Sequence, residues 1–286
     1  MNDNLIVLGG GESGVGAAYL ASQNGISVFL SDKNLIELKY KEILIDNGIE
    51  FEEGSHSIDK VLKASEIVKS PGIPNDSVLI NDIIKKNIPI ISEIEFASRF
   101  TNAKIIGVTG SNGKTTTVSL IYHILKTSGL NVGIGGNIGN SLAFLIAKNK
   151  FDYIVLELSS FQLEWTNKFK PAIAVITNLS PDHLERYDYS FEKYVDAKFN
   201  IVNNQTSSDY LIYNSQDTTI DNELKSRKIS SSKIPFSLVK GRLSNQTYIE
   251  KNSLKSEINK NQFMISLENL SLKGKHNLQN LSLIHI

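Results

Sequence analysis

The residues best suited to chemistry lie in the run GVTGSNGKTTT, which joins an apolar stretch to a helical pattern. Its glycines would expose backbone amides to a phosphate chain, Lys114 would supply a cation, and the Thr115 hydroxyl could ligate Mg²⁺. Val108 replaces the first glycine of the strict P-loop pattern. The run therefore has the shorter form TGSNGKT, which is itself diagnostic of an ATP-binding loop. The run predicts an ATP-binding loop formed by Gly110, Ser111, Asn112, Gly113, Lys114, Thr115 and Thr116.

A second glycine cluster lies near the N-terminus. Gly9, Gly11 and Gly14 form the pattern G-x-G-x-x-G between a strand and a helix, and Asp32 ends the next strand. This spacing brings backbone amides and a helix N-terminus to a diphosphate, while the acid accepts a hydrogen bond from a ribose or a base. A tight turn that only glycine can form is the structural alternative. The pattern predicts a nucleotide site and leaves open whether the ligand is a dinucleotide or a UDP compound.

Three further side chains could act on a bound nucleotide. Glu157 closes an apolar strand, and a carboxylate at that position beside a phosphate loop is suited to Mg²⁺. His183, in the run TNLSPDH, could ligate a metal, orient a substrate or be purely structural. Lys198 shares a helix face with Tyr194, and a surface lysine is the common interpretation of such a position. Glu164 is expected to be solvated.

These residues need elements to position them, and short apolar runs alternate with amphipathic stretches along the chain. Strands are predicted at residues 5–8, 28–30, 67–68 and 89–91, with helices at 15–24, 35–47 and 77–86. A second series has strands at 104–108, 132–134, 153–158 and 172–177, with helices at 115–126, 141–148 and 191–203. Such alternation predicts parallel sheets with helices on their faces.

The two series predict two domains, 1–100 and 101–286, in an α/β fold. The first would be Rossmann-like, and the second would be a P-loop ATP-binding domain with a parallel central sheet. From about residue 207, short polar strands such as 210–213 and 263–267, separated by loops, predict an added small β region. The run GKHN is typical of a helix start, yet the chain stops soon afterwards, so we expect a truncated chain.

Composition narrows the class of protein. The chain of 286 residues carries 30 basic and 30 acidic residues, so no net charge draws it to nucleic acid or to an anionic membrane. It contains no cysteine, which excludes thiolate nucleophiles and disulfides. No apolar run approaches the ~18 residues of a membrane span, and no leader pattern precedes the first strand. We expect a soluble, cytoplasmic monomer.

Several runs, taken together, resemble the Mur ligases. They are TGSNGKTTT, GGNIG at 135–139, LELSSFQLE at 156–164, NLSPDHLERY at 178–187 and DAKFNI at 196–201, joined by GGGESGVG and SPGIP in the first series. The similarity covers essentially residues 5–282 and is weakest between about 215 and 265. The wording of LELSSFQLE and SPDHLERY is most similar to the family member that adds D-glutamate.

The resemblance implies that the first domain binds the UDP part of a sugar substrate rather than NAD. The positions that match this UDP-substrate site are Gly11, Glu12, Ser13, Gly14, Asp32, Lys33, Ser70, Pro71 and Gly72, with Asn137, Ser159, Gln162 and His183 toward its muramoyl-peptide end.

The resemblance further implies ATP and two Mg²⁺ ions in the central domain. Thr115 and Glu157 match ligands of one ion, and His183 matches a ligand of the other. Lys198 matches a lysine that the family carries as a carbamate, whose oxygens can ligate Mg²⁺ as an ammonium cannot. The catalytic residues would then be Lys114, Lys198 and His183.

The end of the chain departs from the family pattern. Asn277 and Asn280, with His276, match a segment that meets the adenine of ATP, but the alanine-rich helix that should follow is replaced. The family's third domain, which holds the amino-acid substrate, is missing. We therefore expect the chain, by itself, to be inactive.

The activity implied is amide-bond formation: ATP phosphorylates the carboxylate of UDP-N-acetylmuramoyl-L-alanine, and the amine of D-glutamate attacks the acyl phosphate. Three alternatives remain. One is a ligase of a neighbouring step, such as the L-alanine-adding step, or a folylpolyglutamate-type ligase. Another is a non-catalytic nucleotide-binding fragment. The last is an NAD-dependent dehydrogenase, which would not explain the glycine loop at Gly110.

Overall fold

A computed structural model describes residues 4–238, 246–251, 253–258 and 261–266. The chain divides into two compact units. The first comprises residues up to 103 together with 135–151 and 160–169, and the second comprises 104–134, 152–159 and 170 onward. The first unit thus takes in two segments that lie beyond residue 100 in the sequence. The predicted domains 1–100 and 101–286 are continuous stretches, whereas each compact unit is built from several segments. The predicted domains therefore stay a prediction.

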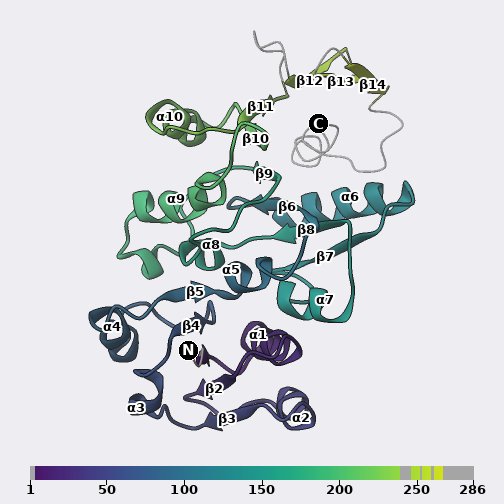
Figure 1. The fold of residues 1–286 in the computed structure, drawn as a ribbon. Helices are drawn as coiled ribbons and strands as arrows, with labels where there is room; N and C mark the ends of the chain where they lie inside the picture. The colour runs from purple at the N-terminus through teal and green to yellow at the C-terminus, as the bar shows by residue number, and fades with distance from the viewer. Residues whose placement is uncertain (1–3, 239–245, 252, 259–260, 267–286) are drawn as a thin grey trace. The chain divides into compact units, whose positions relative to one another are not determined.

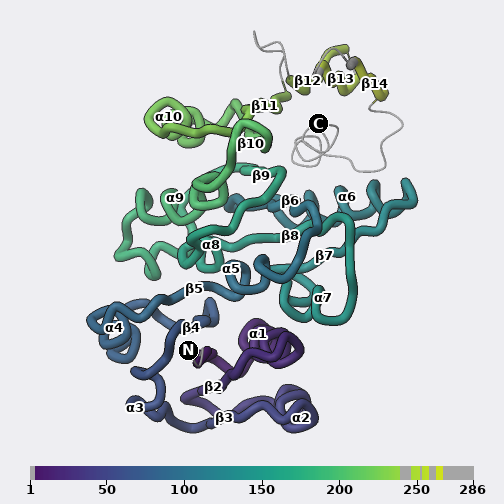
Figure 2. Tube along the Cα trace, viewed as in Figure 1, coloured from purple at the N-terminus to yellow at the C-terminus, as the bar shows by residue number. Residues whose placement is uncertain are grey.

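The first unit contains a five-stranded sheet in the order β3-β2-β1-β4-β5 (Figures 1 and 2). Its strands are β1 (Leu5–Leu8), β2 (Val28–Asp32), β3 (Glu50–Glu53), β4 (Glu66–Lys69) and β5 (Ile90–Ser92). Every pairing in this sheet is parallel. Since β1 has β2 on one side and β4 on the other, the sheet reverses its winding at the carboxyl end of β1, where open α/β sheets bind ligands.

Helices connect these strands and complete the unit. They are α1 (Glu12–Gln23), α2 (Leu38–Asp46), α3 (Ile58–Val61), α4 (Val78–Lys85) and α5 (Glu93–Ser98), joined by α7 (Leu142–Lys148) and α8 (Ser160–Glu164) from later in the chain. The core includes Ile6, Leu8, Ile67 and Ile80, all fully buried. Their apolar side chains come from sheet and helix alike, as two packed layers require.

The second unit contains a sheet that is nine-stranded within the described part of the chain, in the order β14-β13-β12-β11-β10-β9-β6-β8-β7. The strands are β6 (Lys104–Thr109), β7 (Val132–Gly136), β8 (Tyr153–Glu157), β9 (Ile173–Ile176), β10 (Tyr210–Asn214), β11 (Ser232–Phe236), β12 (Gln246–Glu250), β13 (Ser253–Ile258) and β14 (Asn261–Ser266). Its helices are α6 (Lys114–Thr127), α9 (Phe191–Phe199) and α10 (Thr218–Ser226). Short 3₁₀ turns cover Leu184–Tyr187 and Asn200–Val202.

The middle of this sheet is parallel and its far edge is antiparallel. β6 pairs in parallel with both β8 and β9, so the sheet reverses its winding at the end of β6 as well. β10 and β11 continue the parallel order, whereas β12, β13 and β14 pair antiparallel (Figure 1). The α/β class with an added β region is therefore confirmed.

The elements that the sequence did not predict include the short helices α3, α5 and α8, the strand β3 and the helix α10. β3 was not expected, because its sequence EFEE carries three carboxylates and offers one apolar residue. The stretch after residue 207 was expected to hold strands and loops only, yet α10 forms there. The Asp217 side chain caps this helix by accepting hydrogen bonds from the backbone amides of Thr219 and Ile220.

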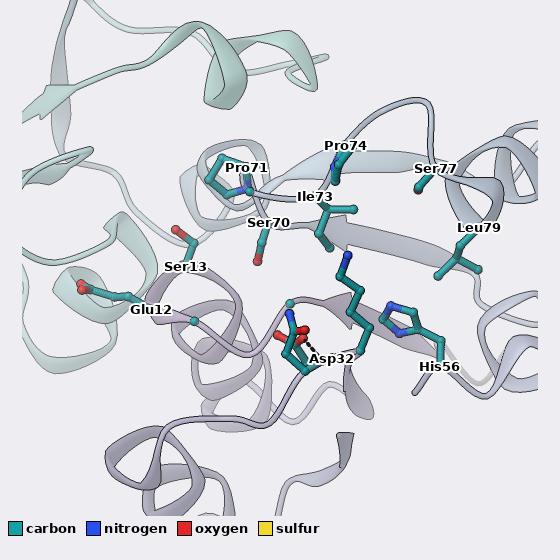
Figure 3. A pocket seen from close by; sticks show the side chains of 15 residues that line it. Glu12, Ser13, Asp32, His56, Ser70, Pro71, Ile73, Pro74, Ser77 and Leu79 are labelled. Atoms are coloured by element: carbon teal, nitrogen blue, oxygen red, sulfur yellow. Dashed lines mark hydrogen bonds between the residues drawn. The ribbon is translucent and has the colours of Figure 1, made fainter. Parts of the chain in front are cut away.

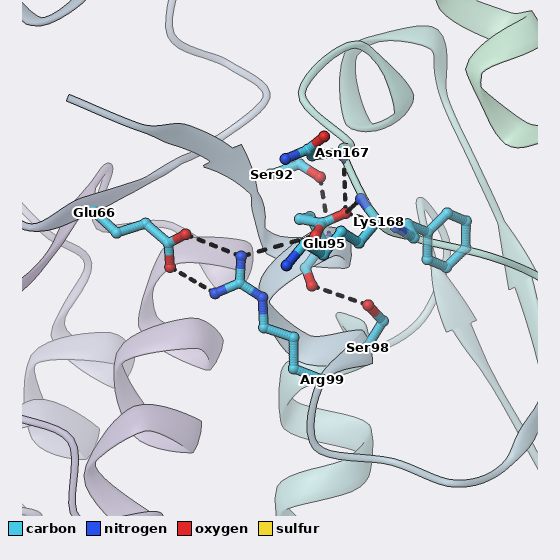
Figure 4. Close-up of polar contacts among 8 residues, drawn as sticks. Glu66, Ser92, Glu95, Ser98, Arg99, Asn167 and Lys168 are labelled. Carbon is cyan, nitrogen blue, oxygen red and sulfur yellow. Dashed lines mark hydrogen bonds and ion pairs between the residues drawn. The ribbon is translucent and has the colours of Figure 1, made fainter. Parts of the chain in front are cut away.

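A buried carboxylate holds the segment after α8 against α5 (Figure 4). The Glu95 side chain is 1% exposed. Its Oε2 accepts hydrogen bonds from the backbone amides of Asn167, Lys168 and Phe169 at 2.9, 2.8 and 2.7 Å. Arg99 lies 3.8 Å from Glu95 and donates two hydrogen bonds to Glu66. Glu95 is thus fully engaged in holding the fold.

Among the described residues, no helix is both long and apolar enough to span a bilayer.

Candidate functional site

The Gly110 loop joins β6 to α6 at the point where the second sheet reverses its winding. Gly110 has φ of 143° and Gly113 has φ of 81°, both in the region that favours glycine. A Cβ on Gly110 would lie 2.0 Å from the Thr177 hydroxyl oxygen, so no side chain fits there. The loop ends at the N-terminus of a fourteen-residue helix, where free amides and the helix dipole favour an anion.

The end of the neighbouring strand β9 fixes the shape of this loop. The Asn178 carbonyl accepts from the Ser111 amide at 2.8 Å, and its side-chain oxygen accepts from the Asn112 amide at 2.9 Å. The Thr177 hydroxyl donates to the Asn112 carbonyl at 2.7 Å. Sequence reasoning did not single out Thr177 or Asn178, although both stand in the run TNLSPDH. Their position just after a strand beside the loop was the available signal.

Lys114 lies folded over the loop. Its Nζ donates to the carbonyl oxygens of Gly110 at 2.9 Å and Ser111 at 2.7 Å. Burial lowers the pKa of Lys114, against the opposing pull of Glu157 and Asp182. A cation held at the mouth of an amide-lined loop can meet the terminal phosphates of a nucleotide.

Thr115 and Glu157 meet although they come from different elements. The Thr115 hydroxyl, in the first turn of α6, donates to Glu157 Oε2 at 2.7 Å. Glu157 ends β8 and is 2% exposed. The described residues contain no group of three His, Cys, Asp or Glu that could hold a metal. Mg²⁺ commonly takes one or two carboxylates and completes its shell with phosphate oxygens and water, so this hydroxyl and carboxylate fit it.

Lys198 is buried, so its interpretation as a surface lysine is wrong. It is 2% exposed, its Nζ donates to the Gly110 carbonyl at 3.0 Å, and it lies 4.6 Å from the centre of the Tyr194 ring. Burial and the nearby Lys114 lower the pKa of Lys198 to about 7. The Tyr194 hydroxyl in turn bonds the Ser111 hydroxyl at 2.9 Å. Lys198 therefore faces the phosphate loop as an amine that is partly neutral near pH 7.

His183 lies in a more exposed place. Its side chain is 57% exposed, with Nε2 3.8 Å from Asp182 and Nδ1 3.6 Å from Glu185. Its backbone has φ of 51°, at the start of the turn Leu184–Tyr187. The metal, catalytic and substrate roles predicted for His183 stay predictions.

The first unit holds a pocket of about 490 Å³ at the end of β1, where that sheet reverses its winding (Figure 3). Of the predicted UDP-substrate residues, it is lined by Gly11, Glu12, Ser13, Asp32, Lys33, Ser70, Pro71 and Gly72. It is also lined by Gly9, Asn34, His56, Ile73, Pro74, Ser77 and Leu79. Gly14 does not line the pocket, and a Cβ there would lie 1.9 Å from the Gly9 carbonyl oxygen, so close packing requires glycine; its predicted substrate role stays a prediction.

Asp32 shapes the pocket as well as lining it. One carboxylate oxygen accepts from the Gly10 amide at 2.5 Å, and the other accepts from the Asn34 amide at 2.8 Å. Sequence reasoning missed His56 and Leu79, which reach the pocket from a loop and a helix that carry no recognisable motif. It also missed Ile73, although this residue stands in the run SPGIP.

The residues predicted near the muramoyl-peptide end are divided between the units. Asn137 and Gln162 belong to the first unit, where Asn137 is exposed and Gln162 is 4% exposed. Ser159 belongs to the second. Asn277 and Asn280, predicted to meet adenine, lie outside the described residues, as does His276.

The N-terminus of α7 is held by two carboxylates. Glu12, from the glycine turn, accepts from the Ser141 amide at 2.8 Å, and Glu93 accepts from the Ala143 amide at 2.6 Å. Burial raises the pKa of Glu93 to about 8, against the Ala143 hydrogen bond and with help from Glu12. Its Oε2 has no hydrogen-bond partner within the part of the chain described. Glu12 thereby ties the pocket wall to α7.

A second set of contacts ties the loop after β4 to α8. The Trp165 indole donates to the Asn75 side-chain oxygen at 3.0 Å, and the Asn75 amide donates to Glu164 at 2.7 Å. Glu164, which was expected to be solvated, is half-buried and also accepts this hydrogen bond from Asn75. This loop carries Ser70, Pro71 and Gly72 of the pocket wall.

The chain matches two family models. Residues 108–284 match the Mur ligase middle domain, and residues 3–92 match the N-terminal domain described as Mur ligase MurD-like. The chain therefore belongs to the Mur ligase family, as its motifs predicted.

Its relatives include proteins named UDP-N-acetylmuramoylalanine--D-glutamate ligase. That of Christiangramia forsetii is 49% identical over 280 residues, which are 98% of this chain and 63% of the relative. That of Bacteroides fragilis is 50% identical over 278 residues, 96% of this chain and 62% of the relative. The chain thus spans about three fifths of the length of these relatives.

Solved structures show the same fold at lower identity. A murein peptide ligase from Psychrobacter arcticus has a TM-score of 0.63 at 18% identity, covering 98% of this chain and 64% of its own. A UDP-N-acetylmuramate-alanine ligase from Thermotoga maritima has a TM-score of 0.54 at 23% identity, covering 98% and 63%.

Proposed function

We infer that this chain serves an ATP-dependent ligase that joins D-glutamate to UDP-N-acetylmuramoyl-L-alanine in peptidoglycan synthesis. The observation that carries the proposal is the meeting of the Thr115 hydroxyl with the Glu157 carboxylate behind a glycine loop at a helix N-terminus. That arrangement suits a nucleoside triphosphate with its cation. The acceptor comes from the names of the relatives, which are about half identical to this chain.

In the proposed reaction the γ-phosphoryl group is transferred from ATP to an oxygen of the L-alanyl carboxylate, and ADP is released. The D-glutamate amine then attacks the acyl carbon, loses a proton, and phosphate departs. No protein nucleophile is required, so the chain acts by positioning and by charge. The loop amides and Lys114 hold the phosphates, and the acidic and hydroxyl side chains of Glu157 and Thr115 hold the cation.

Magnesium, when bound, would neutralise charge on the β- and γ-phosphate oxygens. Its residues in this chain would be Thr115 and Glu157 for one ion, with His183 and a carbamylated Lys198 as further ligands. The low pKa of Lys198 supports the carbamate, because only a neutral amine adds to CO₂. The closed, buried position of the amine, 3.0 Å from the Gly110 carbonyl, supports a role at the loop.

The pocket of the first unit is proposed to take the UDP part of the substrate. Its Gly11 to Ser13 edge forms the N-terminus of α1, where a diphosphate is stabilised. We also propose a cytoplasmic location and a monomeric state. Asn137, Ser159 and Gln162 are proposed to contact the muramoyl-peptide end of the substrate.

A calorimetric titration of the 286-residue chain tests the function. UDP-N-acetylmuramoyl-L-alanine, UDP-N-acetylmuramate and NAD are compared as ligands of the first unit, and ATP with Mg²⁺ is titrated separately. We expect saturable binding that prefers the alanyl compound, together with binding of Mg-ATP. A preference for NAD, or no binding of ATP, would contradict the proposal.

A further inference from the structure

A chain of hydrogen bonds runs beneath one end of the pocket in the first unit. The Ser31 hydroxyl donates to Glu52 Oε1 at 2.6 Å and lies 2.6 Å from Nδ1 of His56. Glu52 also accepts from the Ser57 amide at 2.7 Å and from the Ser57 hydroxyl at 2.5 Å. Burial would raise the pKa of Glu52, but these hydrogen bonds from Ser31 and Ser57 outweigh it and lower the pKa. Glu52 is therefore ionised and can only accept.

This chain of hydrogen bonds fixes the tautomer of His56. A hydroxyl has one proton, and the Ser31 proton is given to the Glu52 carboxylate. The Ser31 oxygen must then accept from His56, so Nδ1 carries the proton. In the neutral ring, Nε2 is left with a lone pair. No residue in the described part of the chain is hydrogen-bonded to Nε2, and His56 lines the pocket.

Burial keeps the His56 ring neutral at neutral pH, although two carboxylates lie near it. Burial lowers the pKa of His56 below 6.5, helped by Lys33 and opposed by Asp32 and Glu52. Asp32 and Lys33 follow β2, and Glu52 belongs to β3. The ring thus offers the pocket an acceptor rather than a donor.

The position of His56 decides which part of a nucleotide it meets. Glu12 and Ser13 lie at one end of the pocket in Figure 3, and His56 and Leu79 lie at the other, with Asp32 between them. A diphosphate is stabilised at the α1 N-terminus, and an acid at the end of the second strand suits the ribose. A nucleotide runs from phosphate through ribose to base, so the base lies at His56.

We propose that His56 selects the nucleobase, its Nε2 accepting the N3–H of uracil and rejecting cytosine, whose N3 is itself an acceptor. This inference rests on the proposed UDP-substrate site and adds the group that reads the base. A site built to hydrogen-bond an N–H discriminates against an analogue that lacks it, because two acceptors then face each other. Leu79 supplies apolar surface at the same end of the pocket, and Ile73 lines it nearer the middle (Figure 3).

The test compares UDP with CDP by calorimetry at about pH 8, where a histidine with a lowered pKa is neutral. We expect the wild-type chain to bind UDP roughly tenfold more tightly than CDP. His56→Phe keeps a ring of similar shape and should bring the two affinities to within about twofold. Below the pKa of His56, where the ring is protonated and Nε2 donates, the wild-type preference should narrow as well.

A second variant leaves His56 in place. Glu52→Gln gives Ser31 an amide donor, so that Ser31 can donate to Nδ1 and the proton can move to Nε2. We expect it to weaken the preference for UDP, whereas Glu50→Gln, on the exposed start of the same strand, should leave the preference unchanged. Thermal unfolding of each variant checks that it folds.

The outcomes separate the two proposals. If the wild-type chain binds neither nucleotide, the UDP-substrate site itself is wrong and the role of His56 falls with it. If UDP binds but the ratio of UDP to CDP affinity is the same in wild type and in a folded His56→Phe variant, only the role of His56 is overturned.

Discussion

Lys114 and Lys198 donate hydrogen bonds to the same acceptor, the Gly110 carbonyl oxygen, at 2.9 and 3.0 Å. Two ammonium groups so close to one oxygen repel each other, and the more deeply buried lysine loses its proton more readily. The pKa of Lys198 accordingly falls to about 7, first through burial and then through Lys114. The loop therefore pairs a cation suited to phosphate with an amine suited to covalent modification.

The first prediction concerns that amine. With ¹³C-labelled bicarbonate at about pH 8, above the pKa of Lys198, the wild-type chain should give a carbamate carbon signal in NMR. Lys198→Arg should abolish the signal, whereas Lys193→Arg, at an exposed position of the same helix, should keep it. An equal signal from Lys198→Arg would show that the modified group lies elsewhere.

Lys114→Met should weaken ATP binding about ten- to a hundredfold, because a charge-assisted contact to phosphate is lost. The fold should persist, since the hydrogen bonds of Lys114 within the described residues go to two loop carbonyls. Calorimetry measures the affinity, and Lys126→Met, at the exposed end of the same helix, is the matched control. Unchanged ATP affinity in Lys114→Met would remove the lysine from the phosphate site.

Thr115→Val should weaken binding of ATP about tenfold when Mg²⁺ is present, because the hydroxyl that can ligate the cation is lost. With the metal chelated by EDTA, the variant and the wild type should bind ATP alike. Ser119→Ala, one helical turn further along α6 and exposed, should show neither effect. A loss of equal size with and without Mg²⁺ would assign Thr115 to the phosphates instead.

Glu93 makes stability depend on pH. Its pKa is about 8 in the folded state against 4.5 for the free side chain, so between these values the folded state binds more protons than the unfolded state. The free energy of unfolding therefore falls as the pH rises from about 5 to about 8. Glu93→Gln removes this slope and should raise Tm by a few degrees at about pH 8.

The matched control for Glu93 is Glu42→Gln, an exposed position on α2, which should leave the pH profile of Tm unchanged. If the Glu93→Gln profile keeps the wild-type slope, the buried carboxyl is not the group that titrates.

Glu95→Ala should lower the free energy of unfolding by about 3 kcal/mol, because three backbone amides, that of Phe169 buried, lose their acceptor. Glu66→Ala, which removes only the more exposed partner of Arg99, should cost about 1 kcal/mol or less. Urea unfolding measures both. A similar cost for the two variants would mean that water replaces Glu95 at the amides.

Local patterns predicted most of the parallel strands, though not β3. The strands at 5–8, 104–108 and 153–158 form where the apolar runs predicted, and the Gly110 loop follows the second of them. Such runs carry their own signal, because buried parallel strands are apolar on both faces. β3 and α10 lack that signal, since tertiary pairing in one and an Asp217 cap in the other stabilise polar sequences.

Contacts between distant residues could not be predicted from local sequence. Lys198 is buried against the Gly110 loop, Ser31 donates its proton to Glu52, and Glu12 accepts from the Ser141 amide. Each contact depends on a partner many residues away. A lysine on an amphipathic helix has the same local pattern whether it faces water or a loop. The residues of the His56 end of the pocket are of this kind, which is why they were missed.

The hydrogen bond between Trp165 and Asn75 gives the chain an optical reporter of its own. Trp165 is the single tryptophan in the sequence, so all indole emission comes from one place. The indole contacts Asn75, at the end of the loop that runs from Ser70 beside the pocket. If filling the pocket shifts this loop, the polarity and hydrogen bonding of one fluorophore change, and an ordinary fluorimeter can follow the event in the unlabelled protein.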